Sequence, residues 1–196
     1  MSAKGLPGEL KDIKTVLLPG NSAFVGADIV SGLYSCGFHG NEKICALIDL
    51  GTNGEMAIGN KDRLMVTSTA AGPAFEGGNI KWGVGSVRGA IAGVHIENGT
   101  TEIKTIGDTH KAVGICGTGV IEAAAELLRN GLIDETGAMS EDYFDDGFPL
   151  AINEKGEEIS FTQKDVREIQ LAKSAIRAGF ETMLKRYGAD YEVSVT

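Results

Sequence analysis

Residues 44–60 carry the pattern that most limits the fold of this chain. The segment reads I-C-A-L-I-D-L-G-T-N-G-E-M-A-I-G-N, two apolar runs on either side of a short G-T-N-G stretch. Glycine and asparagine accept the backbone angles of a tight turn, and apolar runs on both sides of such a turn favour two paired strands. We therefore expect a β-hairpin with its turn at residues 51–54.

The chemistry of this turn suits a phosphate group. Its glycines leave backbone N–H groups uncovered, and Thr52 and Asn53 add side-chain donors. Asp49, at the end of the first strand, would repel a bare polyphosphate, so a carboxylate there favours a bridging Mg²⁺ or the orientation of an attacking water. On the local sequence alone, an ordinary β-turn with Asn and Gly in their usual places is an equal alternative.

Both strands and helices are expected along the rest of the chain. Further strands are expected at residues 15–18, 63–69, 91–97, 101–106 and from 191 to 195, and helices at 23–36, 120–130 and 163–187. The last helix has the clearest limits. Thr162 with Asp165 three residues later is a variant of the capping box, and Gly188 ends the apolar stripe.

Composition excludes several kinds of partner. The 196 residues suffice for one domain, and their net charge of −9 without a basic cluster argues against nucleic acid and against an anionic membrane. There is no signal peptide and no apolar run near the roughly 18 residues of a membrane-spanning helix. We therefore expect a cytoplasmic protein. The three cysteines include no C-x-x-C pair, so we expect buried, reduced thiols and no zinc site.

Three motifs together resemble a known family. D-L-G-T-N-G-E begins at Asp49, A-A-G-P-A-F-E-G-G spans residues 70–78, and G-I-C-G-T-G spans residues 114–119. In this order the motifs resemble the C-terminal region of ATP-dependent reductive activators of corrinoid proteins. That family belongs to the superfamily of acetate and sugar kinases, heat-shock chaperones and actin, whose nucleotide lies between two ribonuclease-H-like lobes.

The resemblance implies an α/β fold, a ribonuclease-H-like lobe with a mixed sheet of five strands, the first three antiparallel, and helices packed on its faces. Residues 15–196 would form the second lobe of an actin-like ATPase domain, truncated at its C-terminus, and residues 1–14 a linker or an artificial end. The first phosphate loop, on the first lobe of the same polypeptide, and the Gly-Gly adenosine motif would lie outside this sequence.

The same resemblance implies the residues of a site. D-L-G-T-N-G-E would be the second phosphate loop, in which Asp49 is catalytic. The ATP-binding residues of this loop would be Gly51, Thr52, Asn53, Gly54 and Glu55. The glycine turn before the second helix would bring Gly117, Thr118 and Gly119 beside the nucleotide, since the N-terminus of a helix attracts anions. The alternative is a glycine turn that is needed only for close packing.

Three further side chains are candidates for the site. Asp28, in G-A-D-I-V-S-G, is similar to a catalytic carboxylate of sugar kinases and would act as a general base or orient a water. Its equal alternative is a carboxylate that stabilises a helix start. Glu76 could reach a metal-bound water, although an exposed loop carboxylate is the favoured interpretation. Lys173 or Arg177 could touch the ribose, against the favoured alternative of a solvated helix face.

The function that the resemblance implies is the nucleotide-binding half of an ATPase, which uses ATP and Mg²⁺ to drive the reductive activation of a Co(II) corrinoid protein or methyltransferase complex. Its electron donor, a 2Fe–2S cluster, would lie in an N-terminal part, because no cysteine pattern here suits one. Two alternatives remain, the lobe of a small-molecule kinase and a non-catalytic interaction module of the same fold. With one side of the nucleotide site, the isolated chain should hydrolyse ATP no faster than background.

Overall fold

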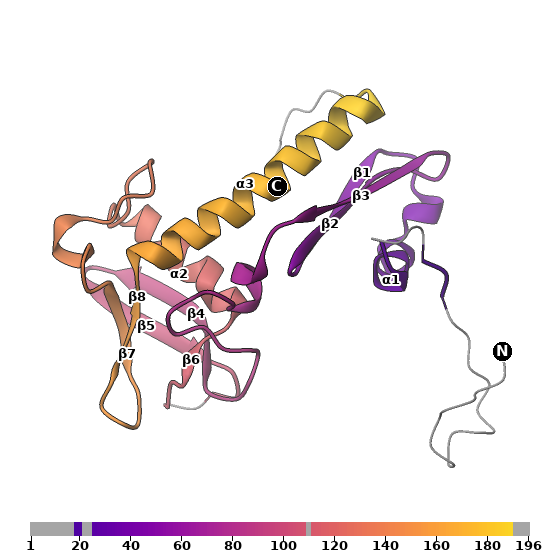
Figure 1. The fold of residues 1–196 in the computed structure, drawn as a ribbon. Coiled ribbons are helices and arrows are strands. Elements are labelled where there is room, and N and C mark those ends of the chain that lie inside the picture. Colours follow the sequence, from indigo (N-terminus) through magenta and orange to yellow (C-terminus); the bar gives the residue numbers. More distant parts are fainter. Residues whose placement is uncertain (1–17, 21–24, 109–110, 190–196) are drawn as a thin grey trace, which may run out of the picture.

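The computed structural model describes residues 18–20, 25–108 and 111–189. Figure 1 shows two regions of β-sheet joined by one long helix, α3 (Gln163–Tyr187), which runs across both. The helix cap predicted at residues 21–22 and the strand predicted from residue 191 lie outside the described residues, as does nearly all of the strand predicted at 15–18.

The first region is the predicted hairpin with a third strand. β1 (Cys45–Leu50) pairs antiparallel with β2 (Asn53–Gly59), and β2 pairs antiparallel with β3 (Leu64–Ala70). Only Gly51 and Thr52 separate the first two strands. The hairpin and the three antiparallel strands predicted at the start of the lobe are therefore confirmed.

Two helices cover opposite faces of this sheet. Side chains alternate between the faces of a strand, so each face has its own apolar set. α1 (Ala27–Ser35) packs on the face that carries Leu47, Ala57 and Val66. On the other face, the fully buried Met56 packs against the C-terminal half of α3.

The second region contains a mixed sheet and a hairpin. β5 (Thr100–Thr105) pairs antiparallel with β4 (Ala90–Glu97), and β4 pairs parallel with the short β6 (Gly114–Ile115). A separate antiparallel hairpin follows, made of β7 (Phe148–Ile152) and β8 (Glu158–Phe161). The strands predicted at residues 91–97 and 101–106 are confirmed.

α2 (Gly117–Arg129) packs along β4 and contributes Val120, Ala123 and Leu127 to the core of the second region. It begins at Gly117, before the predicted start at residue 120, because the G-T-G residues already belong to its first turn. The glycine turn is therefore the helix N-terminus itself.

α3 has the predicted limits and joins the two regions. Thr162 and Asp165 form the reciprocal hydrogen bonds of a capping box, and Gly188 ends the helix with φ 81°. Val166 and Ala172, in its first half, belong to the core of the second region. Its second half packs on the first sheet, as shown above for Met56. One helix thus fixes the two sheets relative to each other.

The expected single sheet of five strands is wrong for the described residues, because their strands form three separate sheets. After β3 the chain turns into a short 3-10 helix, η3 (Pro73–Glu76), which leads away from the first sheet. β4 then pairs with β5 and β6, while Glu122 and Glu126 of α2 accept the N–H groups of Val94 and Ile96. The mixed sheet of the prediction therefore exists, but in the second region.

One element was not predicted, and one expectation needs correction. The β7–β8 hairpin occupies residues for which no strand was predicted from the sequence, and its register shifts between Pro149 and Ala151. Of the cysteines, Cys116 is buried as expected, whereas Cys36 is exposed and Cys45 is half-buried. In the described ranges, no helix has the length and apolar composition that a bilayer crossing requires.

Candidate functional site

The turn between β1 and β2 is tighter than the sequence suggests. The backbone N–H of Gly51 donates to the carbonyl oxygen of Asn53 at 3.0 Å, so this N–H is not free for a ligand. Thr52 and Asn53 are exposed at the tip of the turn. Their side chains are the exposed polar groups that the predicted phosphate turn presents.

Glu76 binds this turn from the adjacent loop. The Thr52 hydroxyl donates to Oε2 of Glu76, and the N–H of Gly72 donates to the carbonyl oxygen of Thr52 at 2.9 Å. The motif at residues 70–78 is thereby fixed against the hairpin turn. Two of the three sequence motifs meet here.

η3 brings the third motif to the same place. A Cβ atom added to Gly117 would lie 1.9 Å from the carbonyl oxygen of Phe75, and one added to Gly119 would lie 2.1 Å from that of Ile91. Both glycines are therefore required for close packing, which is the alternative that the sequence left open. A ligand contact of these two residues stays a prediction.

Thr118 lies between these glycines and is exposed. Its Oγ1 is 3.3 Å from Sγ of Cys116, and this buried thiol donates to the carbonyl oxygen of Ile91 at 3.3 Å. Cys116 is the N-cap residue of α2, and its side chain does not cap the helix. Thr118 is therefore the side chain of the G-T-G turn that is open to a ligand.

Glycine is required at position 54 for close packing of the sheet against α3. It is buried, and an added Cβ would lie 2.8 Å from Cγ1 of Ile176 on α3 and 3.0 Å from Oγ1 of Thr69. A larger residue here would push α3 from the sheet. Loss of ligand binding by such a variant would therefore not identify Gly54 as a ligand contact.

The predicted carboxylates lie on the α1 face of the sheet. The register aligns Asp49, Glu55 and Ser68 across the three strands, and the Ser68 hydroxyl donates to Glu55 at 3.5 Å. Asp28 is exposed in the first turn of α1, where its Oδ1 accepts the N–H of Ile29 at 2.9 Å. In the described part of the chain, no hydrogen bond joins Asp28 to Asp49.

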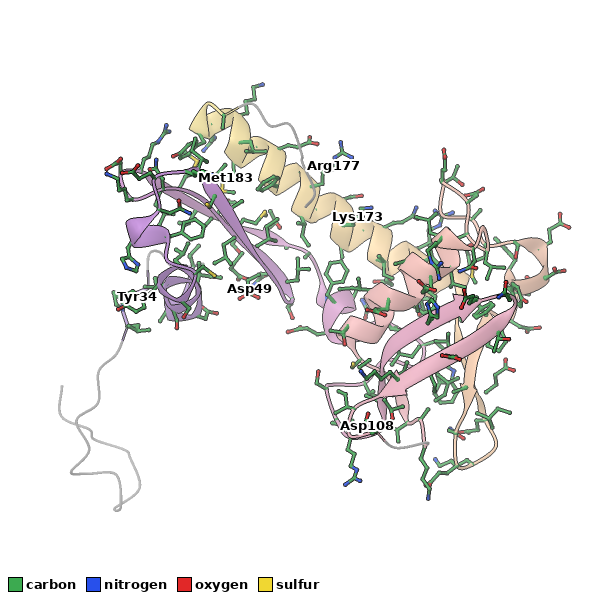
Figure 2. The ribbon with its side chains drawn as sticks, turned by 180° about the vertical axis from the view of Figure 1, so that it is seen from behind. Tyr34, Asp49, Asp108, Lys173, Arg177 and Met183 are labelled. Carbon is green, nitrogen blue, oxygen red and sulfur yellow. The ribbon has the colours of Figure 1, made fainter. Side chains whose placement is uncertain are left out.

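Lys173 lies on the opposite side of the hairpin. In Figure 2, Lys173 and Arg177 lie along α3, and Asp49 lies across the sheet from that helix. Arg177 forms an ion pair with Glu181 at 2.7 Å. The turn tip at Thr52 separates the two sides, so one ligand reaches both Asp49 and Lys173 only by extending past this tip.

An apolar groove of about 610 Å³ begins beside the turn. It runs between α2 and α3, and its wall includes Leu50, Phe75, Ile121, Val166 and Ile169. Polar groups at the groove come from Asp134, Glu135, Gln170 and Lys173. Leu50 directly precedes Gly51 and Phe75 directly precedes Glu76, so the groove adjoins the phosphate turn.

Asp134 gives the groove a fixed acidic group. Its pKa is lowered by the hydrogen bond from the Thr136 hydroxyl and by backbone N–H groups, first that of Ala138. Oδ1 of Asp134 accepts from Thr136 Oγ1 at 2.7 Å and from the N–H of Ala138 at 2.9 Å. These bonds hold an ionised carboxylate at one edge of the groove.

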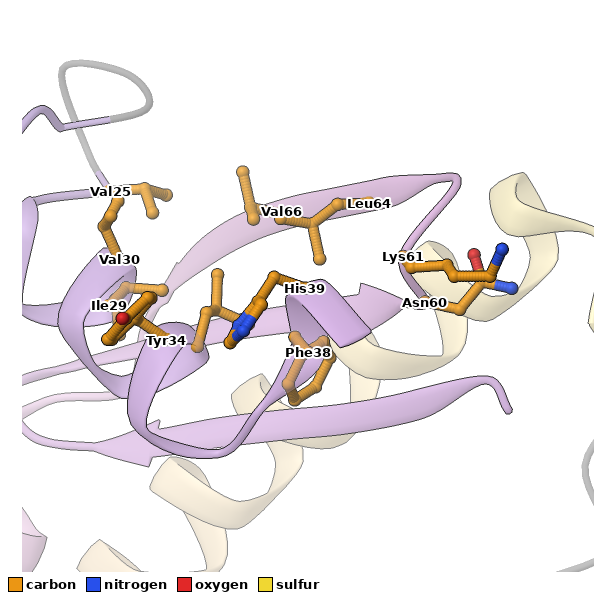
Figure 3. Close-up of a pocket in the computed structure, with 11 residues that line it drawn as sticks. Val25, Ile29, Val30, Tyr34, Phe38, His39, Asn60, Lys61, Leu64 and Val66 are labelled. Carbon is orange, nitrogen blue, oxygen red and sulfur yellow. The ribbon is translucent and has the colours of Figure 1, made fainter. Parts of the chain in front are cut away.

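A second groove, of about 320 Å³, lies between α1, the short helix η2 (Phe38–Gly40) and β3. Figure 3 shows Val25, Ile29, Leu64 and Val66 around it. It also reaches the β2–β3 connection, which is at the end of the sheet opposite the phosphate turn. It is therefore separate from the candidate site.

Sequence reasoning missed the backbone of Phe75 and the side chain of Leu50. Phe75 stands in A-A-G-P-A-F-E-G-G, of which only Glu76 was predicted as a site residue, and its carbonyl oxygen lies against Gly117 at the start of α2. Leu50 is 44% exposed although it is a strand residue, because it borders the groove. The available signal was that side chains alternate between the two faces of a strand, which puts Leu50 on the opposite face from Asp49.

The chain is similar to one known protein family and to individual known proteins. Residues 43–194 match the family described as the C-terminal domain of RACo, the ASKHA domain. The corrinoid activation enzyme RamQ of Eubacterium limosum is 38% identical over 190 residues, 87% of this chain and 32% of that protein. A Co(II) methylated amine-specific corrinoid protein reductase of Methanosarcina barkeri is 33% identical over 207 residues, 93% of this chain and 36% of that protein.

A solved structure is similar as well. It is described as a reductive activator for corrinoid, iron-sulfur protein, and it matches with a TM-score of 0.80 and 38% identity over 88% of this chain and 30% of that one. The predicted ribonuclease-H-like α/β fold is thereby confirmed. The chain spans about a third of the length of these relatives. Because residues 43–194 make up well over half of its length, the chain belongs to the family of C-terminal ASKHA domains of RACo.

Proposed function

We propose that this chain is the nucleotide-binding lobe of a reductive activator of corrinoid proteins, and that it binds ATP with Mg²⁺. One observation carries the proposal. The polar turn at Thr52 and the apolar groove between α2 and α3 adjoin each other through Leu50 and Phe75. A polar turn beside an apolar groove suits a ligand with a polyphosphate at one end and a flat base at the other.

The phosphates would lie at the tip of the hairpin. Thr52 and Asn53 offer side-chain donors there, and the backbone of Gly54 and Glu55 continues the turn into β2. Gly51 would keep the turn narrow, because its own N–H is used internally. Thr118, with Gly117 and Gly119 behind it, would approach the phosphates from α2.

The nucleoside would enter the groove. Ile121, Val166 and Ile169 give it apolar walls, which suit the faces of a purine. Lys173 and the ionised Asp134 lie at the groove and could hydrogen-bond the ribose. This use of the groove makes Lys173 a ligand contact where the sequence alone favoured a solvated helix face.

The carboxylates would act near the reacting phosphate. Among the described residues, no three His, Cys, Asp or Glu side chains gather to hold a metal ion. Mg²⁺, which neutralises charge on phosphate oxygens, would therefore arrive with the nucleotide. Asp49, on the α1 face of the sheet, or Asp28, in α1 itself, would orient the attacking water, and Glu76 accepts the Thr52 hydroxyl at the turn.

The partners follow from what the relatives are said to act on. The word corrinoid stands in the names of all three, the Methanosarcina barkeri relative is named for a corrinoid protein, and the solved structure is named for a corrinoid, iron-sulfur protein. We propose a corrinoid protein or methyltransferase complex as the partner, a first lobe that closes over the nucleotide, and a 2Fe–2S cluster in another part of the full activator. ATP hydrolysis would then drive the conformational change that makes Co(II) reduction possible.

Nucleotide titrations followed by NMR test the binding step on this chain. Thr52→Val keeps the β-branched shape and removes the hydroxyl, so it should weaken Mg-ATP binding by about threefold to tenfold. Thr100→Val, at an exposed position of β5, is the matched control and should bind as the unchanged protein does.

Three results would speak against the proposal. No shift of the 51–54 amides with Mg-ATP would favour the non-catalytic interaction module. Equal affinity of Thr52→Val and the unchanged protein would move the phosphates away from the hairpin. Transfer of phosphate to a small molecule, once a first lobe is supplied, would favour the kinase alternative.

A further inference from the structure

The Glu76 carboxylate occupies the tip of the phosphate turn. Its Oε2 accepts the Thr52 hydroxyl, and its Oε1 lies beside Gly51, where an added Cβ would be 3.6 Å from this oxygen. Both carboxylate oxygens therefore lie along the two residues that separate β1 from β2. The hydroxyl that the turn offers to a phosphate is already bound.

The backbone that carries Glu76 is held firmly. Gly77 N–H donates to Ala74 at 3.1 Å, Gly78 N–H donates to Pro73 at 2.8 Å, and Gly77 has φ 81°. The hydrogen bond from the N–H of Gly72 to the carbonyl oxygen of Thr52 holds the start of this loop against the hairpin. The Glu76 side chain itself is exposed, so it can change its rotamer while the loop stays in place.

A phosphate at Thr52 changes the balance of this contact. The hydroxyl can donate to a phosphate oxygen only after it leaves Glu76, because it has one proton. A free polyphosphate would then face an uncompensated carboxylate at close range, whereas a polyphosphate that carries a divalent cation would offer that carboxylate a partner. The same residue thus opposes one form of the ligand and favours the other.

We propose that Glu76 is a positioning residue that makes this turn select the Mg²⁺ complex of the nucleotide over the free nucleotide. It holds the Thr52 hydroxyl in the empty turn, releases it to the phosphate, and then faces the cation or one of its waters. The inference rests on the proposed nucleotide binding and deepens it. It assigns Glu76 a role in specificity, which is distinct from the water-orienting role of Asp49 or Asp28.

The test compares ATP affinity in MgCl₂ and in EDTA, measured from NMR titrations of this chain. In Glu76→Gln the amide oxygen still accepts the Thr52 hydroxyl, but the negative charge is gone. The dissociation constant in EDTA divided by that in MgCl₂ should be about fivefold or more lower in this variant than in the unchanged protein, mainly because the free nucleotide binds more tightly. A thermal melt of the same variant shows that the fold is retained.

Glu102→Gln is the matched control, because it removes one negative charge from exposed β5 in the second region. It should leave the ratio unchanged. A Glu76→Gln variant that binds ATP with the ratio of the unchanged protein would overturn the inference and leave the proposed function standing. No ATP binding by any of these proteins, with or without Mg²⁺, would overturn the proposed function and this inference with it.

Discussion

Oε2 of Glu126 accepts the backbone N–H of Ile96 at 2.7 Å, so a side chain of α2 occupies the edge of β4 where a further strand would pair. One helical turn earlier, Glu122 accepts the N–H of Val94 at 3.4 Å. Arg129 also takes the place of a neighbouring strand, because it donates to the carbonyl oxygen of Ile96 at 3.0 Å. Because β6 pairs only with the start of β4, these side chains close the rest of that edge.

The bonds at Glu126 predict a loss of stability in acid. Hydrogen bonds from Arg129 and then from the N–H of Ile96 lower the pKa of Glu126 from 4.5 to about 2. The unfolded chain binds the proton more readily, so this carboxylate stabilises the fold fully above about pH 4.5 and loses its effect as the pH falls toward 2. Urea unfolding measured across this range should show the decline.

Glu126→Gln isolates this contribution. Its amide oxygen can still accept the N–H of Ile96, but it does not titrate, so its stability should depend less on pH between 4.5 and 2 than that of the unchanged protein. Glu102→Gln removes an exposed carboxylate and should keep the original dependence. Identical slopes for Glu126→Gln and the unchanged protein would show that other carboxylates cause the acid sensitivity.

Gly117→Ala should destabilise the fold through a backbone clash. The added methyl would lie 1.9 Å from the carbonyl oxygen of Phe75, which cannot turn aside as a flexible side chain can. Either η3 or the first turn of α2 must shift, and overpacking of this kind costs about 1–3 kcal/mol. Chemical denaturation measures the loss.

Gly85→Ala is the comparison for this variant, since an added methyl there meets nothing within 4 Å. It should change the free energy of unfolding little. If Gly117→Ala is as stable as Gly85→Ala, the contact between η3 and α2 is looser than the structure has it, and a ligand role becomes the better explanation of the G-T-G glycines.

Asp165→Ala should be among the most destabilising changes on α3. The carboxylate is fully buried, and it accepts the N–H of Lys81 at 2.8 Å, the N–H of Thr162 at 2.8 Å and the Thr162 hydroxyl at 2.7 Å. Alanine leaves these donors without their partner, at roughly 1–3 kcal/mol for each one that stays buried. Thr162→Ala removes the cap and the hydroxyl that donates to Asp165, but it keeps both backbone N–H donors paired with the carboxylate, so it should cost about 1 kcal/mol. A smaller loss for Asp165→Ala than for Thr162→Ala in urea unfolding would contradict this ranking.

Local signals made the elements predictable. The G-T-N-G turn between apolar runs fixed the first hairpin, and Thr162 with Asp165 and Gly188 fixed both ends of α3. The division into separate sheets depends on contacts such as Glu126 with Ile96, thirty residues apart in sequence. The sequence around Glu126 and around Ile96 contains no local signal for this hydrogen bond, so the order of the strands in the sheets could not be predicted from the sequence.

In the candidate site, too, the sequence predicted the segments but not the contacts between residues that are distant in sequence. Motif order suggested that Thr52, Glu76 and Gly117 belong to one place, and the structure brings their segments together through η3. The sequence did not show why glycine is needed at Gly54 and Gly117. An added Cβ at these positions would meet Ile176 and Phe75, which lie far from them in sequence. A glycine that binds a phosphate and a glycine that packs against a helix look alike in one sequence.

Lys173 provides the last prediction, which separates the groove from the phosphate turn. If the groove receives the nucleoside, Lys173→Ala removes a donor near the ribose and should weaken ATP binding by about threefold to tenfold. Inorganic tripolyphosphate has no nucleoside, so its affinity for the turn at Thr52 should not change. Lys185→Ala removes the same charge from an exposed position in the last turn of α3, and it should leave both affinities unchanged. Parallel NMR titrations with the two ligands measure all four quantities. Equal weakening of both ligands by Lys173→Ala would show that this lysine acts on the phosphates, and the groove would then lose its assignment to the nucleoside.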